Sequence, residues 1–219
     1  MKSAVVVLVL AGCGAVKDVP MDAAKNDGRP IDTQQAIDAP MIDAPDLSPH
    51  VVFVTSTTHS GSFGGVLRAD AICQARAQEA GLVGTYMAWI ADANLSPSTH
   101  MTQHLGPYRK TDGTIVAQGW SDLTDGSLLA RIDRTERNVQ LGGSGCNPGP
   151  TCNFICEGGE VWSNVDAAGG RRATGDCTSW TGAGSGTAGN DGKVDAAWTV
   201  GTCSAIGCGS ALPLFCVQQ

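Results

Sequence analysis

Nine cysteines and four histidines are the residues of this 219-residue chain whose types offer the most chemistry. Such a cysteine content is high for a reducing compartment and typical of chains that are oxidised after export. Eight of the nine follow residue 70, and this even number allows four disulfide bridges. Cys146, Cys152 and Cys156 could instead bind zinc together with Cys203, but in an oxidising compartment disulfides are favoured.

The ninth cysteine, Cys13, follows a pattern that is typical of an export signal. After Met1-Lys2, the apolar run from Ala4 to Leu10 is far shorter than the ~20 residues that span a bilayer, but it fits the core of a secretory signal. Leu10-Ala11-Gly12-Cys13 resembles the lipobox of bacterial lipoproteins, where the chain is cut before a lipid-bearing cysteine. The resemblance implies a signal peptide over residues 1–12 and a lipid at Cys13 that anchors the protein to a membrane. The alternative is a plain secretory signal with a chance cysteine.

The histidines and acidic residues do not form a known metal-binding motif. His100 and His104 are four residues apart and could share a helix face, but no glutamate completes a His-Glu-x-x-His pattern, so we expect surface histidines. The densest oxygen cluster is Asn190, Asp191 and Asp195 in a glycine-rich loop. Calcium takes ~6–8 oxygens, so we expect a solvated turn there. The sequence therefore predicts no bound metal and no other cofactor.

Catalytic motifs are not found either. The sequence has no Gly-x-Ser-x-Gly nucleophile elbow, no glycine-rich phosphate loop with a lysine, and no residue pair that suggests a catalytic dyad. The net charge of −7 argues against nucleic acid as a partner and against electrostatic attraction to an anionic membrane surface. We expect a protein that is not an enzyme.

Residues 13–49 have the composition of a spacer. Residues 14–50 carry seven acids and three bases, and Ile-Asp-Ala-Pro occurs twice, from Ile37 and from Ile42. Prolines favour extended backbone, and a segment so poor in aromatic residues cannot bury enough apolar surface to offset its ordering entropy. We predict an acidic tether that holds a domain of residues 50–219 away from the membrane.

Hydrophobic patterning predicts the elements that must position the remaining residues. The β-branched run 51–55 predicts a strand, and apolar spacing over 66–80 predicts a helix that ends at Gly81. Trp89 should lie in the core, on a buried strand over 86–91. Further strands are expected near 114–117, 160–163, 197–200 and 212–217. One early helix, short mostly antiparallel strands and long loops predict an α+β fold.

Several segments share their order and cysteine spacing with a known family. They are Ala69–Gln74 with Ala80–Trp89, Val161–Ser163 with Gly169–Arg172, Cys177–Trp180, and the pair Cys208 and Cys216. Together they resemble the endostatin domain at the C-terminus of collagens XV and XVIII, over about His50 to Val217. The resemblance implies a C-type-lectin-like fold. The domain is also similar to one in bacterial surface lipoproteins of unknown function, notably from spirochaetes and myxobacteria, and the lipobox agrees with this second resemblance.

The resemblance implies two nested disulfides, Cys73 to Cys216 and Cys177 to Cys208. The other four cysteines allow three pairings. Among these we favour Cys146 with Cys152 and Cys156 with Cys203.

The resemblance also bears on ligands. Endostatin binds zinc through several histidines near the domain start, and only His50 lies at a matching place. It binds heparin through surface arginines. The candidates here are Arg131, Arg134, Arg137, Arg171 and Arg172, of which only the last two lie in a matched segment, and we expect ordinary surface charge. Calcium-dependent lectins use a Trp-Asn-Asp triplet, which Trp120-Ser121-Asp122 matches only in part.

These observations predict a lipoprotein of the cell envelope whose domain binds a glycan or an extracellular protein without catalysis. A structural envelope protein that contacts peptidoglycan or other envelope proteins is one alternative, and an enzyme with an unrecognised site is another. Gly14 is not the aspartate that retains many lipoproteins at the inner membrane, so we favour the outer membrane.

Overall fold

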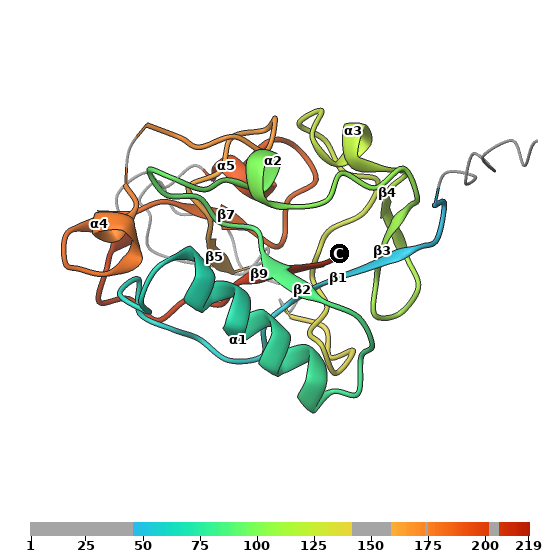
Figure 1. Cartoon of the computed structure of the whole chain (residues 1–219), viewed down its shortest axis with the longest axis horizontal. Coiled ribbons are helices and arrows are strands. Elements are labelled where there is room, and N and C mark those ends of the chain that lie inside the picture. The colour runs from blue at the N-terminus through green and yellow to red at the C-terminus, as the bar shows by residue number, and fades with distance from the viewer. Residues whose placement is uncertain (1–45, 142–158, 174, 202–205) are drawn as a thin grey trace, which may run out of the picture. The chain divides into compact units, whose positions relative to one another are not determined.

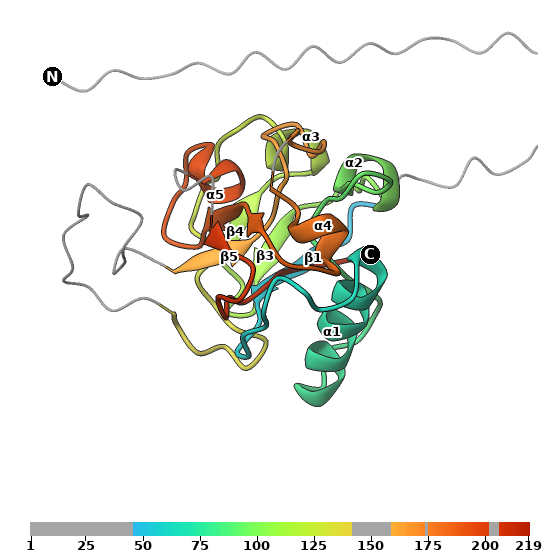
Figure 2. The same ribbon diagram turned by 90° about the vertical axis from the view of Figure 1, so that its left-hand side faces the viewer.

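The computed structural model describes residues 46–141, 159–173, 175–201 and 206–219. Every described residue belongs to one compact unit, Asp43–Gln219, and the predicted signal peptide lies outside the described residues. That unit is α+β, with one long helix and short strands joined by long loops (Figures 1 and 2). Within the described ranges, no helix is both long and apolar enough to cross a bilayer. Five cysteines with predicted roles lie outside the described residues: Cys13, Cys146, Cys152, Cys156 and Cys203.

A five-stranded sheet with the strand order β2-β9-β1-β3-β4 forms the centre of the unit. Its strands are β1 (His50–Val54), β2 (Tyr86–Ala88), β3 (Tyr108–Lys110), β4 (Ile115–Ala117) and β9 (Phe215–Gln218). The central strand β1 is parallel to β3 and antiparallel to β9, so the first and last strands of the domain are neighbours. The other two pairs in this sheet are antiparallel.

Helix α1 (Val66–Glu79) packs against β2 and β9 (Figure 1). Its buried residues Val66, Ala69, Cys73 and Ala77 recur at the three- and four-residue spacing of one helix face. The helix ends as predicted, because Gly81 takes a left-handed φ of 74° and the N–H of Leu82 then donates to the carbonyl oxygen of Ala77 at 2.9 Å.

The rest of the unit consists of very short elements. β5 (Glu160–Trp162) pairs with β7 (Ala188–Asn190), and β6 (Ser185–Gly186) pairs with β8 (Ile206–Gly207). Four one-turn helices accompany these strands: α2 (Pro97–His100), α3 (Trp120–Leu123), α4 (Cys177–Trp180) and α5 (Ala197–Val200).

Three of the predicted strands differ from those observed. The strand predicted over 86–91 ends at Ala88, so Trp89 lies just outside it. The strand expected at 197–200 is wrong, because Asp195 accepts the N–H of Ala197 at 3.0 Å and so starts the helical turn α5 despite β-branched Thr199 and Val200. The last strand begins at Phe215 rather than at residue 212, because Leu212 and Leu214 form isolated bridges to other segments.

The turn α4 winds left-handed. Cys177, Thr178, Ser179 and Trp180 have φ values of 51°, 57°, 53° and 61°. This conformation costs roughly 1–2 kcal/mol for each residue with a side chain. Several bonds offset the cost: Asp176 accepts the N–H of Ser179 at 3.1 Å, and the Trp180 carbonyl oxygen accepts the N–H groups of Gly64 and Gly65.

Buried tryptophans link the sheet to the short elements. Trp89 is fully buried, as predicted, and its indole N–H donates to Oγ1 of Thr199 at 2.8 Å. The indole N–H of Trp180 donates to the carbonyl oxygen of Ala91 at 2.9 Å. Trp162 and Trp198 are equally buried. The indole N–H of Trp162 donates to the carbonyl oxygen of His59 at 2.8 Å. Because each indole fills a large volume and three of them also make a hydrogen bond to a distant segment, they fix loops that have little secondary structure of their own.

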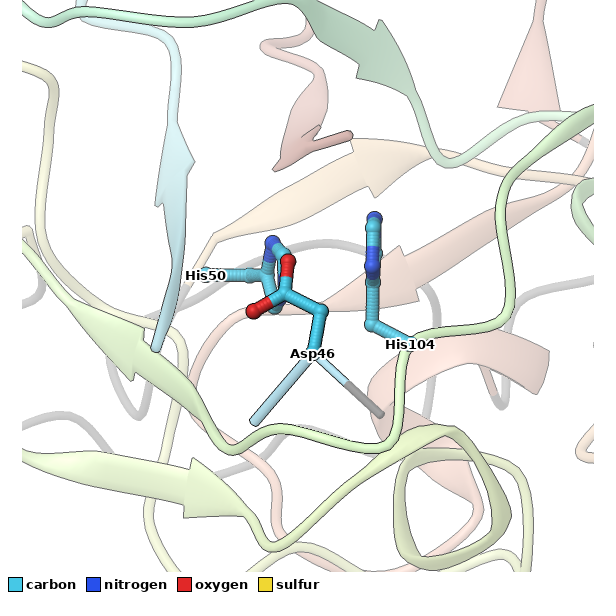
Figure 3. Close-up of side chains that lie close together, drawn as sticks. All are labelled: Asp46, His50 and His104. Carbon is cyan, nitrogen blue, oxygen red and sulfur yellow. The ribbon is translucent and has the colours of Figure 1, made fainter. Parts of the chain in front are cut away.

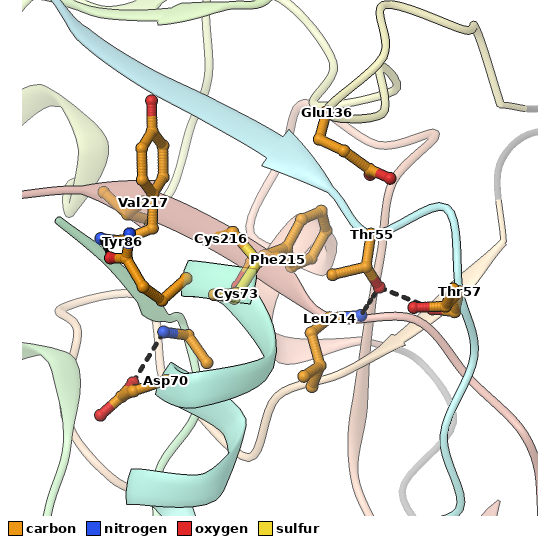
Figure 4. The surroundings of a disulfide bond; sticks show 12 residues. Thr55, Thr57, Asp70, Cys73, Tyr86, Glu136, Leu214, Phe215, Cys216 and Val217 are labelled. Carbon is orange, nitrogen blue, oxygen red and sulfur yellow. Dashed lines mark hydrogen bonds between the residues drawn. A yellow bond between two sulfur atoms is a disulfide. The ribbon is translucent and has the colours of Figure 1, made fainter. Parts of the chain in front are cut away.

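Both disulfides that the resemblance implies are present. Cys73 of α1 bonds to Cys216 of β9 with a Cα separation of 5.5 Å, and both residues are fully buried (Figure 4). Cys177 of α4 bonds to Cys208 with a Cα separation of 5.7 Å. The first bridge joins the long helix to the last strand, and the second holds the left-handed turn.

Candidate functional site

Three side chains with metal-ligating atoms gather where the chain enters β1. Asp46 lies in the segment that leads into this strand, His50 is its first residue, and His104 lies in the loop between α2 and β3 (Figure 3). Their ligand atoms all lie within 4.8 Å of one another. Among the His, Cys, Asp and Glu residues of the described ranges, no other group of three meets this criterion.

The parallel pairing of β1 with β3 produces this meeting. His50 is in register with Tyr108, and its N–H donates to the carbonyl oxygen of Pro107 at 2.8 Å. The loop before β3 therefore lies beside the segment before β1. Gly106 permits the close approach, because a Cβ at this position would collide with the carbonyl oxygen of Ser48.

The two imidazole rings are stacked, with centroids 3.6 Å apart and planes inclined by 19°. His50 is only 5% exposed, and His104 is half-buried. The Nε2 atoms of both rings are buried without a hydrogen-bond partner. Asp46 is exposed, and its Oδ1 accepts the N–H of Ser48 at 2.8 Å. The site thus combines two buried ring nitrogens with a carboxylate that is exposed to solvent.

The electrostatics favour neutral rings beside an ionised acid. Burial lowers the pKa of His50, and the nearby His104 lowers it further. Burial also lowers the pKa of His104. Hydrogen bonds from the side chain and the backbone of Ser48 hold the pKa of Asp46 below its usual value. Neutral imidazoles keep a lone pair for a ligand, and an ionised carboxylate offers an oxygen, so the set suits a divalent transition metal.

The expectation for the histidines is wrong in two respects. His100 and His104 do not share a helix face, because α2 ends at His100 and Met101 is already extended. His104 is not a simple surface histidine, since its Nε2 is buried against His50. His100 instead bonds Oδ2 of Asp70 at 2.8 Å.

In the predicted oxygen cluster at the end of β7, the side chains of Asn190 and Asp195 bond to backbone N–H groups of their own loop. Asn190 accepts the N–H of Gly192 at 2.9 Å, and Asp195 starts α5. Asp191 is different, since it is 2% exposed and its Oδ1 has no hydrogen-bond partner. Burial raises the pKa of Asp191 to about 7, and the charge of Asp133 adds to the effect.

The candidate arginines do not act as one basic surface. Arg134 pairs with Asp112 at 3.0 Å, and Arg171 pairs with Asp176 at 3.0 Å. Arg137 lies near Glu79, and Arg172 donates to the carbonyl oxygen of Val200. Arg131 is exposed. The partial lectin triplet is likewise local, because Asp122 accepts the N–H of Gln118 at 2.6 Å.

No protein-family model matches the chain, and the search of curated proteins finds no match either. The metal-ligating cluster therefore depends on geometry alone. Sequence reasoning singled out His50 through the resemblance but missed Asp46 as its partner and misread His104. The only signal was indirect, because His50 comes just before the predicted strand at 51–55. His104 likewise comes before β3, but this strand of three residues was not predicted.

Proposed function

We propose that this chain is an exported lipoprotein of the bacterial envelope. It is anchored at Cys13, and its one domain binds a ligand. In this proposal residues 13–49 form the tether, and residues 50–219 form an endostatin-like variant of the C-type-lectin-like fold. The domain binds a glycan or a protein ligand without catalysis, at the outer membrane. A fold alone does not identify a ligand, so the ligand class has to come from experiment.

The observation that carries the proposal is the pair of disulfides. Cys73–Cys216 and Cys177–Cys208 are the two pairs that the endostatin resemblance implies, and both have the Cα separations of a normal bridge. Disulfides persist outside the reducing cytosol, which agrees with the export signal. The early helix α1 and the adjacency of β1 and β9 also support the proposed fold.

The surface of the described residues favours a protein ligand over a sugar. Its exposed large hydrophobic side chains are all aliphatic, for example Leu47, Leu105 and Leu129, which are each about three-fifths exposed. Aromatic side chains, which offer a flat face for stacking, are buried or half-buried instead.

The perturbed carboxyl of Asp191 does not favour an enzyme. A raised pKa in a cleft is a common sign of a catalytic acid. Asp191, however, is almost completely buried, and its neighbour Asp133 is bound to Lys110 at 2.8 Å. Neither group presents its carboxyl to a substrate in the part of the chain that the structure describes.

Labelling tests the anchor. Cells that express the chain should incorporate labelled palmitate into it, and Cys13→Ala should remove the label while the protein is still exported. Equal labelling of both proteins would exclude Cys13 as the lipidated residue.

Arrays of glycans and of extracellular and envelope proteins test the binding domain. The full chain, purified in detergent, should bind a defined set of spots saturably, and the reduced and alkylated chain should not. Binding to peptidoglycan alone would favour the structural envelope role. Turnover of any substrate that one point substitution abolishes would overturn the non-catalytic proposal.

A further inference from the structure

The strongest unexplained feature of the molecule is the pair of unpartnered ring nitrogens in the Asp46–His50–His104 cluster. The other histidines of the described ranges each have a polar partner: His59 bonds Oγ1 of Thr57 at 3.1 Å, and His100 bonds Asp70. Nε2 of His50 and Nε2 of His104 are buried with none. Buried polar atoms in native proteins are nearly always paired, so two orphans side by side call for a ligand that satisfies both.

A proton does not satisfy this arrangement. Two protonated imidazoles at a centroid separation of 3.6 Å would repel each other, and the additional protons would still need acceptors. A cation that accepts lone pairs from both rings removes the two orphans together. The exposed carboxylate of Asp46 lies within 4.8 Å of ring nitrogens of both histidines and supplies a negative charge.

We propose that Asp46, His50 and His104 bind one divalent transition-metal ion of the zinc class, through one ring nitrogen of each histidine and one carboxylate oxygen. Two imidazoles and a carboxylate are ligands of zinc, whereas calcium and magnesium take sets of oxygen atoms. Three protein ligands leave a fourth tetrahedral position for water or for an acidic group of a partner.

The cluster comes close to the dimensions of such an ion, and one ring has to turn to complete the site. Zinc–ligand distances of ~2.0–2.2 Å place neighbouring ligand atoms of a tetrahedral site ~3.5 Å apart. The ligand atoms here lie within 4.8 Å of one another, and the exposed side chain of Asp46 reaches the ion after a small shift that releases its bond to the Ser48 N–H. The lone pair of an imidazole lies in the ring plane, so two stacked rings cannot both face one ion as they stand. Binding therefore requires one ring to turn, and the half-buried His104 is the ring with more room.

This set differs from the one that the resemblance implies. Zinc in endostatin is held by several histidines near the domain start, and of these only His50 has a counterpart here. Asp46 and His104 come from this chain's own segments. The ion would join the last residues before β1 to the loop before β3, and so clamp the end of the proposed tether onto the domain. The inference goes beyond the proposed binding function and does not depend on the identity of its ligand.

Zinc titration of the purified full chain tests the proposal. After treatment with a chelator, the oxidised chain in detergent should bind one Zn²⁺ by equilibrium dialysis and calorimetry, and its melting temperature should rise. His104→Ala and Asp46→Asn should each weaken binding by at least about tenfold. His59→Ala, which changes a histidine outside the cluster, should bind zinc like the wild type.

Cobalt distinguishes this site from one built on cysteine. Co²⁺ should give the visible bands of a nitrogen- and oxygen-bound ion, without the near-ultraviolet charge transfer that thiolates produce. Asp46→Asn changes an exposed residue, so its fold is retained even if His50→Ala fails to fold. Coincident zinc titrations of wild type, His104→Ala and Asp46→Asn, or no zinc bound by the wild type, would overturn the proposal.

Discussion

The two described disulfides lie in regions of the domain that are stabilised by different means. The sheet region, α1 with β1, β2 and β9, contains Cys73–Cys216 and buries apolar faces of regular elements. The turn region, α4 and α5 with β5 to β8, contains Cys177–Cys208, and its strands have only two or three residues. Stability in the sheet region is therefore spread over many apolar contacts. The turn region shares buried tryptophans with that core, but its short elements also depend on a few hydrogen bonds and one disulfide, each of which can be removed singly.

The largest expected effect comes from opening the sheet region. Replacing both Cys73 and Cys216 with Ala removes a bridge across 143 residues. In the chain-entropy model this costs about 5 kcal/mol of unfolding free energy, which is comparable with the whole stability of many domains. Urea unfolding followed by tryptophan fluorescence measures the loss. A loss below about 1 kcal/mol would contradict the assigned role of this bridge.

Asp191 makes the turn region sensitive to pH. Its pKa is raised from 3.8 to about 7, so its contribution to stability is full below pH 4 and is lost as pH rises to 7. At about 1.4 kcal/mol per pKa unit, the loss is up to about 4 kcal/mol. Asp191→Asn should therefore be more stable than the wild type at pH 8 and similar to it at pH 4.

The control for Asp191 is the neighbouring exposed acid. Asp195→Asn keeps the oxygen that starts α5, so its stability should follow the wild-type pH profile. Urea unfolding at several pH values measures all three proteins. An Asp191→Asn profile parallel to that of the wild type would exclude Asp191 as the source of the pH dependence.

Opening the second bridge should affect the turn region alone. Replacing Cys177 and Cys208 with Ala opens a span of 31 residues, which corresponds to roughly 3–4 kcal/mol in the same model. The left-handed turn then loses a constraint that opposes its backbone strain. Hydrogen exchange should show lost protection around α4 and retained protection in α1 and β9. Equal loss in both regions would show that they unfold as one unit.

The smallest effect is expected at the residue that caps the left-handed turn. Asp176→Ala removes the bond to the Ser179 N–H and the ion pair with Arg171, and it should cost about 1 kcal/mol. Arg171→Ala removes only the half-exposed ion pair and should cost less than that. Thermal unfolding of the two single variants and the double variant separates the contributions. A larger loss in Arg171→Ala would assign the stability to the ion pair.

Hydrophobic patterning predicted the sheet region better than the turn region. Helix α1, its end at Gly81, β1 and the start of β2 were predicted because they are long enough to show periodicity or end in a residue with a special φ. β3 has only three residues, Tyr-Arg-Lys, and β6 and β8 have two each. β4 and β5 are as short as β3, but strands were predicted near 114–117 and 160–163 from their apolar residues. β3, β6 and β8 lack such a run, and they form strands because their partners are already in place.

The candidate metal site shows the same limit. His50 was singled out just before the first predicted strand, but its meeting with His104 depends on the parallel pairing of β1 with β3. That pairing joins residues more than fifty positions apart, and no local pattern records it. The strand expected at 197–200 failed for a related reason, since one side-chain bond from Asp195 outweighed the β-branched composition.

The central position of β1 has a mechanical consequence for an anchored protein. In the proposed anchored protein, a pull on the membrane side of the chain would run along β1, which is bonded to β3 on one edge and to β9 on the other. Hydrogen bonds of a sheet lie across its strands, so such a load acts on them in shear and is shared by the whole set, instead of peeling them apart one at a time. In the proposed anchored protein, the domain would thus be suspended from a strand that is hydrogen-bonded along both edges.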